Sequence, residues 1–227
     1  MTPAALLTSF RQSVFDENAP FLWSDDEFYE FATDAQEMFT RLTGGIADST
    51  TASVTQLTAT ASTEYTAISP LILKIRLARR ADFRSLEILN FEDAEGAGRE
   101  DDYGSQWRGN RLDATEGPLA GMISGMEQDQ VRWLPIPAVT ETVMLTVDRL
   151  PLKSVTAGTK FEIHAHHHIH LLHWIKYRAY SKADAETFDK TRAGESKNRF
   201  NEYVDGLARI ERNRRRHKYR TVQYRGL

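Results

Sequence analysis

Six of the seven histidines in this 227-residue chain fall within ten residues, between positions 164 and 173. Residues four apart share one face of a helix, so His166 with His170, or His164 with His168, could bind one metal ion through neutral imidazoles. A zinc-hydrolase helix requires a glutamate between its two histidine ligands, and neither of these pairs has one. The chain also contains no cysteine. We therefore expect these histidines to line a wall or an interface, and we predict neither a bound metal nor another cofactor.

The other patterns that could support catalysis are missing. There is no G-x-S-x-G motif and no glycine-rich phosphate-binding motif. The acids of the segment Glu92–Asp113 lack the spacing of a calcium-binding loop. We predict that the protein is not an enzyme; a metal-dependent enzyme that uses the histidine-rich helix is the weakest alternative.

The C-terminal segment is strongly basic. Residues 209–225 contain eight arginines and lysines and one glutamate, which gives a net charge of +7. Such a segment could neutralise nucleic-acid phosphates, and binding would then weaken steeply with salt. Tyr219, Val222 and Tyr224 alternate with charged or polar neighbours, which is typical of an extended arm that docks on another protein. We favour a docking arm and keep DNA binding as the alternative. The candidate arm residues are Arg212, Arg214, Arg215, Arg216, Lys218, Tyr219, Arg220, Val222, Tyr224 and Arg225.

The opposite end of the chain is acidic. Residues 1–50 carry nine acids and two bases, a net charge of −7, although the whole chain has a net charge of only −3. Segments of opposite charge on identical subunits attract one another across a head-to-tail contact. The division of charge therefore fits self-association as well as nucleic-acid binding.

Two helices are expected to position the acidic residues. Apolar residues recur at helical spacing over residues 3–15 and again from Phe28 to Leu42. Ser24 and Glu27 have the spacing of a capping box, in which each side chain satisfies a free backbone N–H of the other residue. Gly44 and the next glycine can adopt the left-handed backbone conformation that ends a helix. Ser24 and Glu27 are therefore predicted to have a structural, helix-capping role.

The middle of the chain has the alternation of β-strands. Leu73, Ile75 and Leu77 alternate with less apolar residues, which predicts a half-buried strand with these three side chains on its buried face. Further strands are expected at residues 85–89, 130–134 and 142–147, and the stretch 92–113 is expected to be a long exposed loop. No apolar run approaches the length of a membrane span, and the first ten residues are of mixed polarity. We expect no membrane partner and no secretory signal.

Helical spacing returns after residue 160. It predicts one helix over residues 161–180 and a second over residues 184–216, with a break plausible at Gly194 or Gly206. The predicted fold is α+β: a helical bundle of the N- and C-terminal helices, an inserted small antiparallel β module and an extended basic C-terminal arm. The expected parts are residues 1–48 (N-terminal helices), 49–160 (β module), 161–208 (C-terminal helices) and 209–227 (basic helix end and arm).

These elements resemble the adaptor, or head-completion, proteins found beneath the portal ring in the neck of tailed bacteriophages. The resemblance rests on the segment from Leu22 to Gln36, on the proline-flanked β segments 134–137 and 149–152, and on the closing helices, in which Trp174, Ala179 and Tyr180 match a run of the family. Two features depart from the family: the histidine-rich stretch 164–173 and the long loop 92–113.

The resemblance implies a structural virion protein. It implies a ring, expected to be a dodecamer, that joins the portal to a tail protein (nozzle or tail tube) and continues the channel through which the viral DNA is ejected. The partners would be the portal, the tail protein, other copies of the chain and the DNA that passes through. The basic arm would dock on the portal, and assembly would take place in the host cytoplasm.

Overall fold

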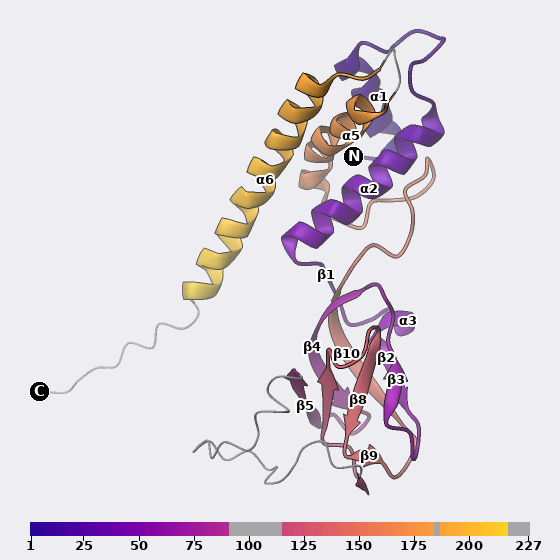
Figure 1. The fold of residues 1–227 in the computed structure, drawn as a ribbon, viewed down its shortest axis with the longest axis vertical. Coiled ribbons are helices and arrows are strands. Elements are labelled where there is room, and N and C mark those ends of the chain that lie inside the picture. The colour runs from indigo at the N-terminus through magenta and orange to yellow at the C-terminus, as the bar shows by residue number, and fades with distance from the viewer. Residues whose placement is uncertain (91–114, 184–186, 218–227) are drawn as a thin grey trace, which may run out of the picture. The chain divides into compact units, whose positions relative to one another are not determined.

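A computed structural model describes residues 1–90, 115–183 and 187–217, with only the backbone described for 211–217. The fold is mixed α+β (Figure 1), as predicted. Contacts divide the chain into two units, which we call the helical unit (residues 1–44 and 151–227) and the β unit (residues 45–150). The predicted loop 92–113 lies outside the described residues.

The first two helices lie close to their predicted limits because local capping residues determine both ends. Helix α1 (Pro3–Val14) begins after Thr2, whose side chain accepts a hydrogen bond from the Ala5 N–H. Helix α2 (Asp25–Thr43) begins at the capping box of Ser24 and Glu27 and ends at Gly44 with φ +92°.

The helical unit has one apolar core, to which α1, α2 and two later helices contribute. These are α5 (His168–Ser181), which follows the short 3₁₀ helix η2 (Ala165–His167), and α6 (Lys190–His217). Trp23 packs edge-on against Phe10 and Tyr180 in this core, and its indole N–H donates to the Ala179 carbonyl at 3.3 Å. The loop before η2 is fixed to α2, because the Val155 N–H donates to Thr33 and the Glu162 N–H donates to Gln36.

The two C-terminal helices differ from their predicted limits. Helix α5 begins at His168 rather than near Phe161, since His164 is in extended conformation and the next three residues form η2. Helix α6 continues through Gly194 and Gly206 without a break, so its 28 residues span about 42 Å. Each glycine lowers local helix stability by about 1 kcal/mol, which the packing of Ala193, Phe200 and Val204 on the core offsets.

The β unit is built on an eight-stranded sheet with the order β1-β10-β4-β5-β7-β8-β3, in which β2 pairs with β10 beside β1. The sheet curls so that β3, at one end of this order, comes close to β2, where the Thr66 hydroxyl donates to the Thr58 carbonyl. Buried side chains from most of the strands, among them Trp133 and Met122, form its core. The elements are β1 (Ile46–Asp48), α3 (Ala52–Thr55), β2 (Gln56–Ala59), β3 (Tyr65–Ala67), β4 (Ile72–Arg80), β5 (Ser85–Asn90), β6 (Glu116–Gly117), β7 (Gly121–Ser124), β8 (Gln130–Leu134), β9 (Ile136–Pro137) and β10 (Glu141–Arg149).

The prediction of a purely antiparallel module is wrong. Strand β5 pairs in parallel with β7, and β6 pairs in parallel with β9; the other pairs are antiparallel. Parallel neighbours require a long connection, which residues 91–120 provide between β5 and β7. Strand β7 (Gly121–Ser124) was not among the predicted strands, so its parallel pairing with β5 was missed.

Strand β4 exists as predicted, and of its three predicted inward residues Ile75 packs on the core and Leu77 is half-buried, but the spacing of the inward positions differs from the prediction. Ile72, Ile75 and Ala78 face the core, whereas Leu73 is 43% exposed. The register against β10 shifts twice, each time by one extra residue in β4, so the inward positions are three residues apart instead of two. In β10 the alternation holds, and Val143, Leu145 and Val147 are all buried as predicted.

Gly45 illustrates how closely the chain passes β10 as it enters the β unit. It has φ +98°, and a Cβ added there would lie 2.7 Å from the Asp148 Cβ and 3.2 Å from the Arg149 nitrogen. We expect Gly45→Ala to lower the free energy of unfolding by about 3 kcal/mol, since it combines backbone strain with a clash. Gly44→Ala is the matched control: it has φ +92° but no atom within 4 Å, so about 1 kcal/mol is expected. Urea unfolding of both variants checks this, and equal losses would contradict it.

Candidate docking surfaces

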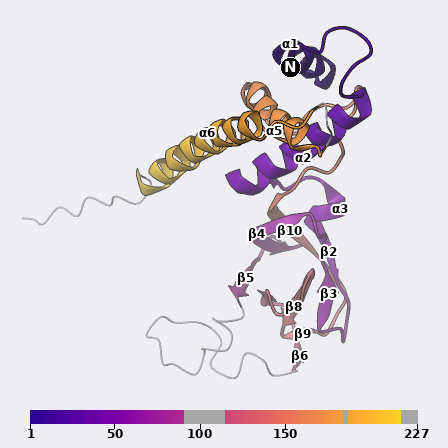
Figure 2. The same ribbon diagram turned by 45° about the horizontal axis from the view of Figure 1, so that its top comes forward.

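The basic segment begins on the last turns of α6. Arg212, Arg214, Arg215 and Arg216 belong to the helix, whose backbone is described as far as His217. Leu207 still packs against the helical core, but Ile210 is already 51% exposed. Both ribbon views show this end of α6 extending beyond the start of α5 (Figures 1 and 2). The other candidate arm residues, Lys218, Tyr219, Arg220, Val222, Tyr224 and Arg225, lie outside the described residues.

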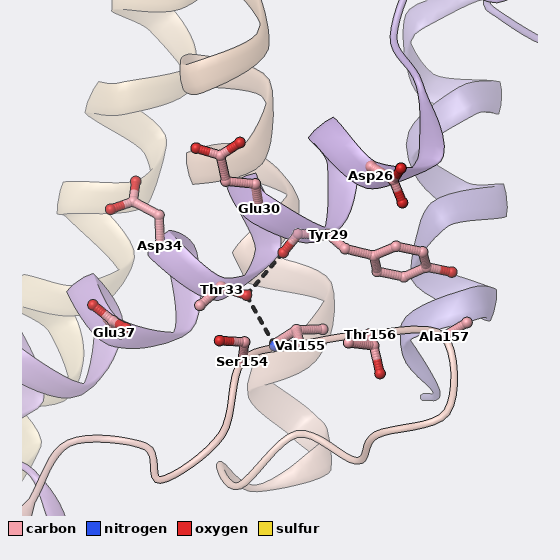
Figure 3. Close-up of a pocket in the computed structure, with 10 residues that line it drawn as sticks. All are labelled: Asp26, Tyr29, Glu30, Thr33, Asp34, Glu37, Ser154, Val155, Thr156 and Ala157. Carbon is pink, nitrogen blue, oxygen red and sulfur yellow. Dashed lines mark hydrogen bonds between the residues drawn. The ribbon is translucent and has the colours of Figure 1, made fainter.

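The acidic residues of α2 line a groove of about 650 Å³ (Figure 3). One side of the groove is α2, with Asp26, Glu30, Asp34 and Glu37. The other side is the loop of residues 154–157. The Thr33 hydroxyl joins the two sides, because it accepts the Val155 N–H at 2.9 Å while it donates to the Tyr29 carbonyl. We call this feature the acidic groove.

The charges of the acidic groove are only partly compensated. Asp34 accepts hydrogen bonds from the Trp174 indole at 2.7 Å and from Arg178 at 2.8 Å. For Asp26, Glu30 and Glu37 there is no basic side chain within 4 Å among the described residues. Burial, followed by the charge of nearby Asp25, raises the pKa of Tyr29, so its hydroxyl is neutral at physiological pH. The groove therefore presents three carboxylates that are free to attract cations.

Ser24 and Glu27 fix the start of α2 and so the position of the groove. The Ser24 hydroxyl accepts the Glu27 N–H at 3.2 Å, and the Glu27 carboxylate accepts the Ser24 N–H at 3.0 Å. Glu27 also accepts from Lys182 Nζ at 2.6 Å, which joins α2 to the end of α5. The hydrogen bond from Lys182, with those from Ser24, holds the pKa of Glu27 below its ordinary value. Glu27 thus serves the fold and is not free to bind a partner.

The histidine-rich stretch mainly packs helices together. His167 lies 2.7 Å from the Tyr203 hydroxyl, and His170 stacks on the Tyr203 ring with centroids 3.6 Å apart. Burial first, and then the neighbouring histidines, lower the pKa of His167 to about 4, so its ring is neutral at physiological pH. These contacts attach the start of α5 to α6.

His168 is buried and uses both ring nitrogens. Nδ1 lies 2.8 Å from the Met1 carbonyl oxygen and Nε2 lies 3.0 Å from that of Ile163, while the ring packs on Phe161. The spacing of His164 and His168 permits a ligand pair, but both ring nitrogens of His168 are occupied by carbonyl oxygens. Within the described part of the chain, no group of three or more metal-ligating side chains could hold an ion.

A second hollow, of about 240 Å³, lies among α1, α5 and α6 and carries positive charge. Lys176 and His173 line it from α5, and Arg192 and Arg199 line it from α6; among the described residues, Glu195 is the only carboxylate in its lining. Arg192 also approaches Asp189 at 3.4 Å. We call this feature the cationic pocket.

The cations of this pocket repel one another. Burial, and then the charge of Arg199, lower the pKa of Lys176. Burial, and then Lys176, His170 and Arg199, lower the pKa of His173. Neither Lys176 nor Arg199 has a carboxylate within 4 Å among the residues that the structure describes. An anionic group from outside would relieve this repulsion.

Sequence reasoning did not identify the cationic pocket. His173 and Lys176 are three residues apart on α5, and Arg192 and Arg199 are seven apart on α6, so each pair lies on one helix face. Such spacing is common on solvated helices. Only the packing of α5 on α6 indicates that the two faces meet.

None of the helices in the described part of the chain combines the length and apolarity that a membrane crossing needs. No curated protein matches this chain closely enough to count as a relative. The family model described as SU10 adaptor protein matches residues 1–225, which is nearly the whole chain. The predicted resemblance to phage adaptors is thereby confirmed, and the chain belongs to the SU10 adaptor protein family, a family of bacteriophage adaptors.

Proposed function

We propose that this adaptor acts in the neck of the virion, as a ring that joins the portal to a nozzle or tail-tube protein and continues the DNA channel. Family membership over residues 1–225 supports an adaptor with a structural role in the virion. The observation that carries the ring is that one helical unit presents two surfaces of opposite charge, the acidic groove and the basic side of α5 and α6. Two different surfaces that fit one another generate a heterologous contact, and such contacts close into rings when the rotation allows.

The portal contact is assigned to the basic end of α6 and the segment after it. Residues 209–225 carry a net charge of +7, and α6 carries the first of them beyond its packed core residues. A basic segment of this kind suits an acidic partner surface, with arginines that can form paired hydrogen bonds to carboxylates. The β unit is then the part available to the tail protein. No catalytic step is part of this proposal.

The test is electron microscopy of this protein mixed with the portal of the same phage. We expect a ring of adaptor stacked on the portal ring, with twelve copies. Mass photometry of the same mixture gives the copy number independently. A protein that stays monomeric in the presence of the portal at micromolar concentration would contradict the proposal.

DNA binding is the second candidate, and the observation that favours it is the same +7 segment. Binding to duplex DNA would fall by orders of magnitude between low and moderate salt, because each phosphate contact releases counterions. Deletion of residues 211–227 would remove it. A mobility-shift assay with duplex DNA at several salt concentrations separates the candidates, since portal assembly needs no DNA.

A further inference from the structure

The cationic pocket holds charge that the described residues of its own chain do not neutralise. Lys176 is half-buried beside Arg199, and the described residues of the lining contain one carboxylate, that of Glu195. Keeping an ammonium group partly out of water next to another cation is unfavourable unless an anion completes the site. The charge of the described lining therefore favours an acidic partner.

Phe15 points to a protein partner rather than a small ion. It lies on the rim of the pocket, is 89% exposed, and has a left-handed backbone with φ 61° at the end of α1. A large aromatic side chain held out in water beside cations is typical of the centre of a protein interface, where aromatic residues and arginine are enriched. A free phosphate would make no use of it.

The acidic groove has the complementary properties. Asp26, Glu30 and Glu37 have no basic partner within 4 Å among the described residues, and the groove between α2 and residues 154–157 leaves room for a side chain to enter. The groove and the pocket share no residue. A single chain can therefore use both at once, one with each neighbour.

We propose that the cationic pocket of one copy receives the acidic groove face of α2 from a second copy of this chain. The proposal rests on the ring stated under the proposed function and identifies the contact between its neighbouring subunits. Carboxylates of α2 approach Lys176 and Arg199, and Phe15 is covered by the partner's helix. Because the two surfaces differ, the contact is heterologous: it repeats from subunit to subunit around the ring and does not close as a two-fold dimer.

Cysteine cross-linking tests the contact directly, since the chain has no cysteine of its own. A chain with both Glu30→Cys and Arg192→Cys, treated with a short bis-maleimide, is expected to give a ladder of covalent oligomers. The single variants give no ladder, because a head-to-tail contact needs one cysteine on each surface. The control pair is Glu30→Cys with Lys190→Cys, an exposed position on the same end of α6 but on another side of the helix. An equal ladder from the control pair would overturn the proposal.

Charge reversal is the second test. We expect Lys176→Glu with Arg199→Glu to weaken self-association about tenfold or more, and Glu30→Lys with Glu37→Lys to do the same. A chain that carries all four changes restores opposite charges and should recover most of the association. Lys190→Glu is the matched control and should change nothing. If both double variants lose self-association and the variant with all four changes does not recover it, the proposed contact is contradicted.

The outcomes separate this proposal from the proposed function. A ring on the portal without cross-links overturns the contact and leaves the adaptor ring standing. A ladder from the free protein without a ring on the portal supports the contact and overturns the portal-bound adaptor. If Lys176→Glu with Arg199→Glu abolishes DNA binding and no ladder forms, the pocket binds phosphates and the proposal is wrong.

Discussion

A chain with Asp48→Ala is expected to lose about 3–5 kcal/mol of the free energy of unfolding, enough to leave the β unit largely unfolded if its stability is near the lower end of the usual range. Asp48 is 8% exposed and Arg149 is 7% exposed, and the Arg149 Nε donates to Asp48 at 2.6 Å. Removal of the carboxylate takes one ion-pair partner away from the buried guanidinium of Arg149. It also removes the acceptor for the N–H groups of Thr50 and Thr51.

The control for this variant is another aspartate of the same unit. Asp82 approaches Arg84 at 3.4 Å, but both side chains are largely exposed, so Asp82→Ala should change stability by less than about 0.5 kcal/mol. Urea unfolding followed by tryptophan fluorescence measures both. A loss below about 1 kcal/mol for Asp48→Ala would show that the ion pair with Arg149 and the hydrogen bonds from Thr50 and Thr51 contribute little to stability.

Acid pH provides an independent measurement of the same group. Burial raises the pKa of Asp48, but the hydrogen bonds from Thr51, Thr50 and Arg149 outweigh burial and hold the pKa well below its ordinary value of 3.8. A carboxyl with a depressed pKa in the folded state stabilises the fold fully above its unfolded pKa and loses this contribution as the pH falls. The stability difference between the native chain and Asp48→Asn should therefore be constant above about pH 5 and shrink as the pH falls toward 2.

The sequence was sufficient where the determinants are local. Helix α2 begins at Ser24 and ends at Gly44 as predicted, because a capping box and a left-handed glycine act within four residues of the helix ends. Strand β10 shows the predicted alternation because one face packs on the core along its length. For α2, one short stretch of chain contains the residues that decide where the helix begins and ends; for β10, the pattern of the strand itself marks the face that packs on the core.

The predictions from sequence were wrong or incomplete where the structure depends on contacts between residues far apart in the chain. The buried face of β4 depends on register shifts against β10, and the direction of β5 depends on pairing with β7. The start of α5 depends on His168, whose ring nitrogens contact the carbonyl oxygens of Met1 and Ile163. No pattern of spacing contains these contacts. The partnership of Asp48 with Arg149 joins residues 101 positions apart and was missed for the same reason.

The cationic pocket changes how the charges of this chain are interpreted. Net charges of −7 and +7 at the two ends suggested that the ends attract one another between copies. The pocket offers a basic surface on α5 and α6 that does not include residues 209–225. The acidic groove can then contact a neighbour through the pocket, and the basic segment is left free for the portal. The two proposals therefore require different residues and can be tested separately.

Deletion of residues 211–227 is expected to weaken binding to the portal by at least about a hundredfold and to leave the fold intact. Loss of two hydrogen bonds to charged groups, at about 1.5 kcal/mol each, already accounts for a factor of this size. The fold should persist because the α6 side chains that pack on the core end at Leu207 among the described residues, and Ile210 is half exposed. Circular dichroism and thermal unfolding of the deletion variant check this part.

Point variants then distinguish charge from length. Arg→Gln at the four arginines of the helix end, Arg212, Arg214, Arg215 and Arg216, should reproduce a large part of the loss, whereas Arg→Lys should retain most binding at low salt. The matched control is Lys153→Gln with Lys160→Gln, which removes two exposed cations from the same unit. Portal binding by biolayer interferometry should fall for the arginine variants alone and should weaken for the native chain as salt rises. If the deletion variant binds the portal as tightly as the native chain, the portal contact lies elsewhere on the adaptor, since the only residues assigned to it would be gone.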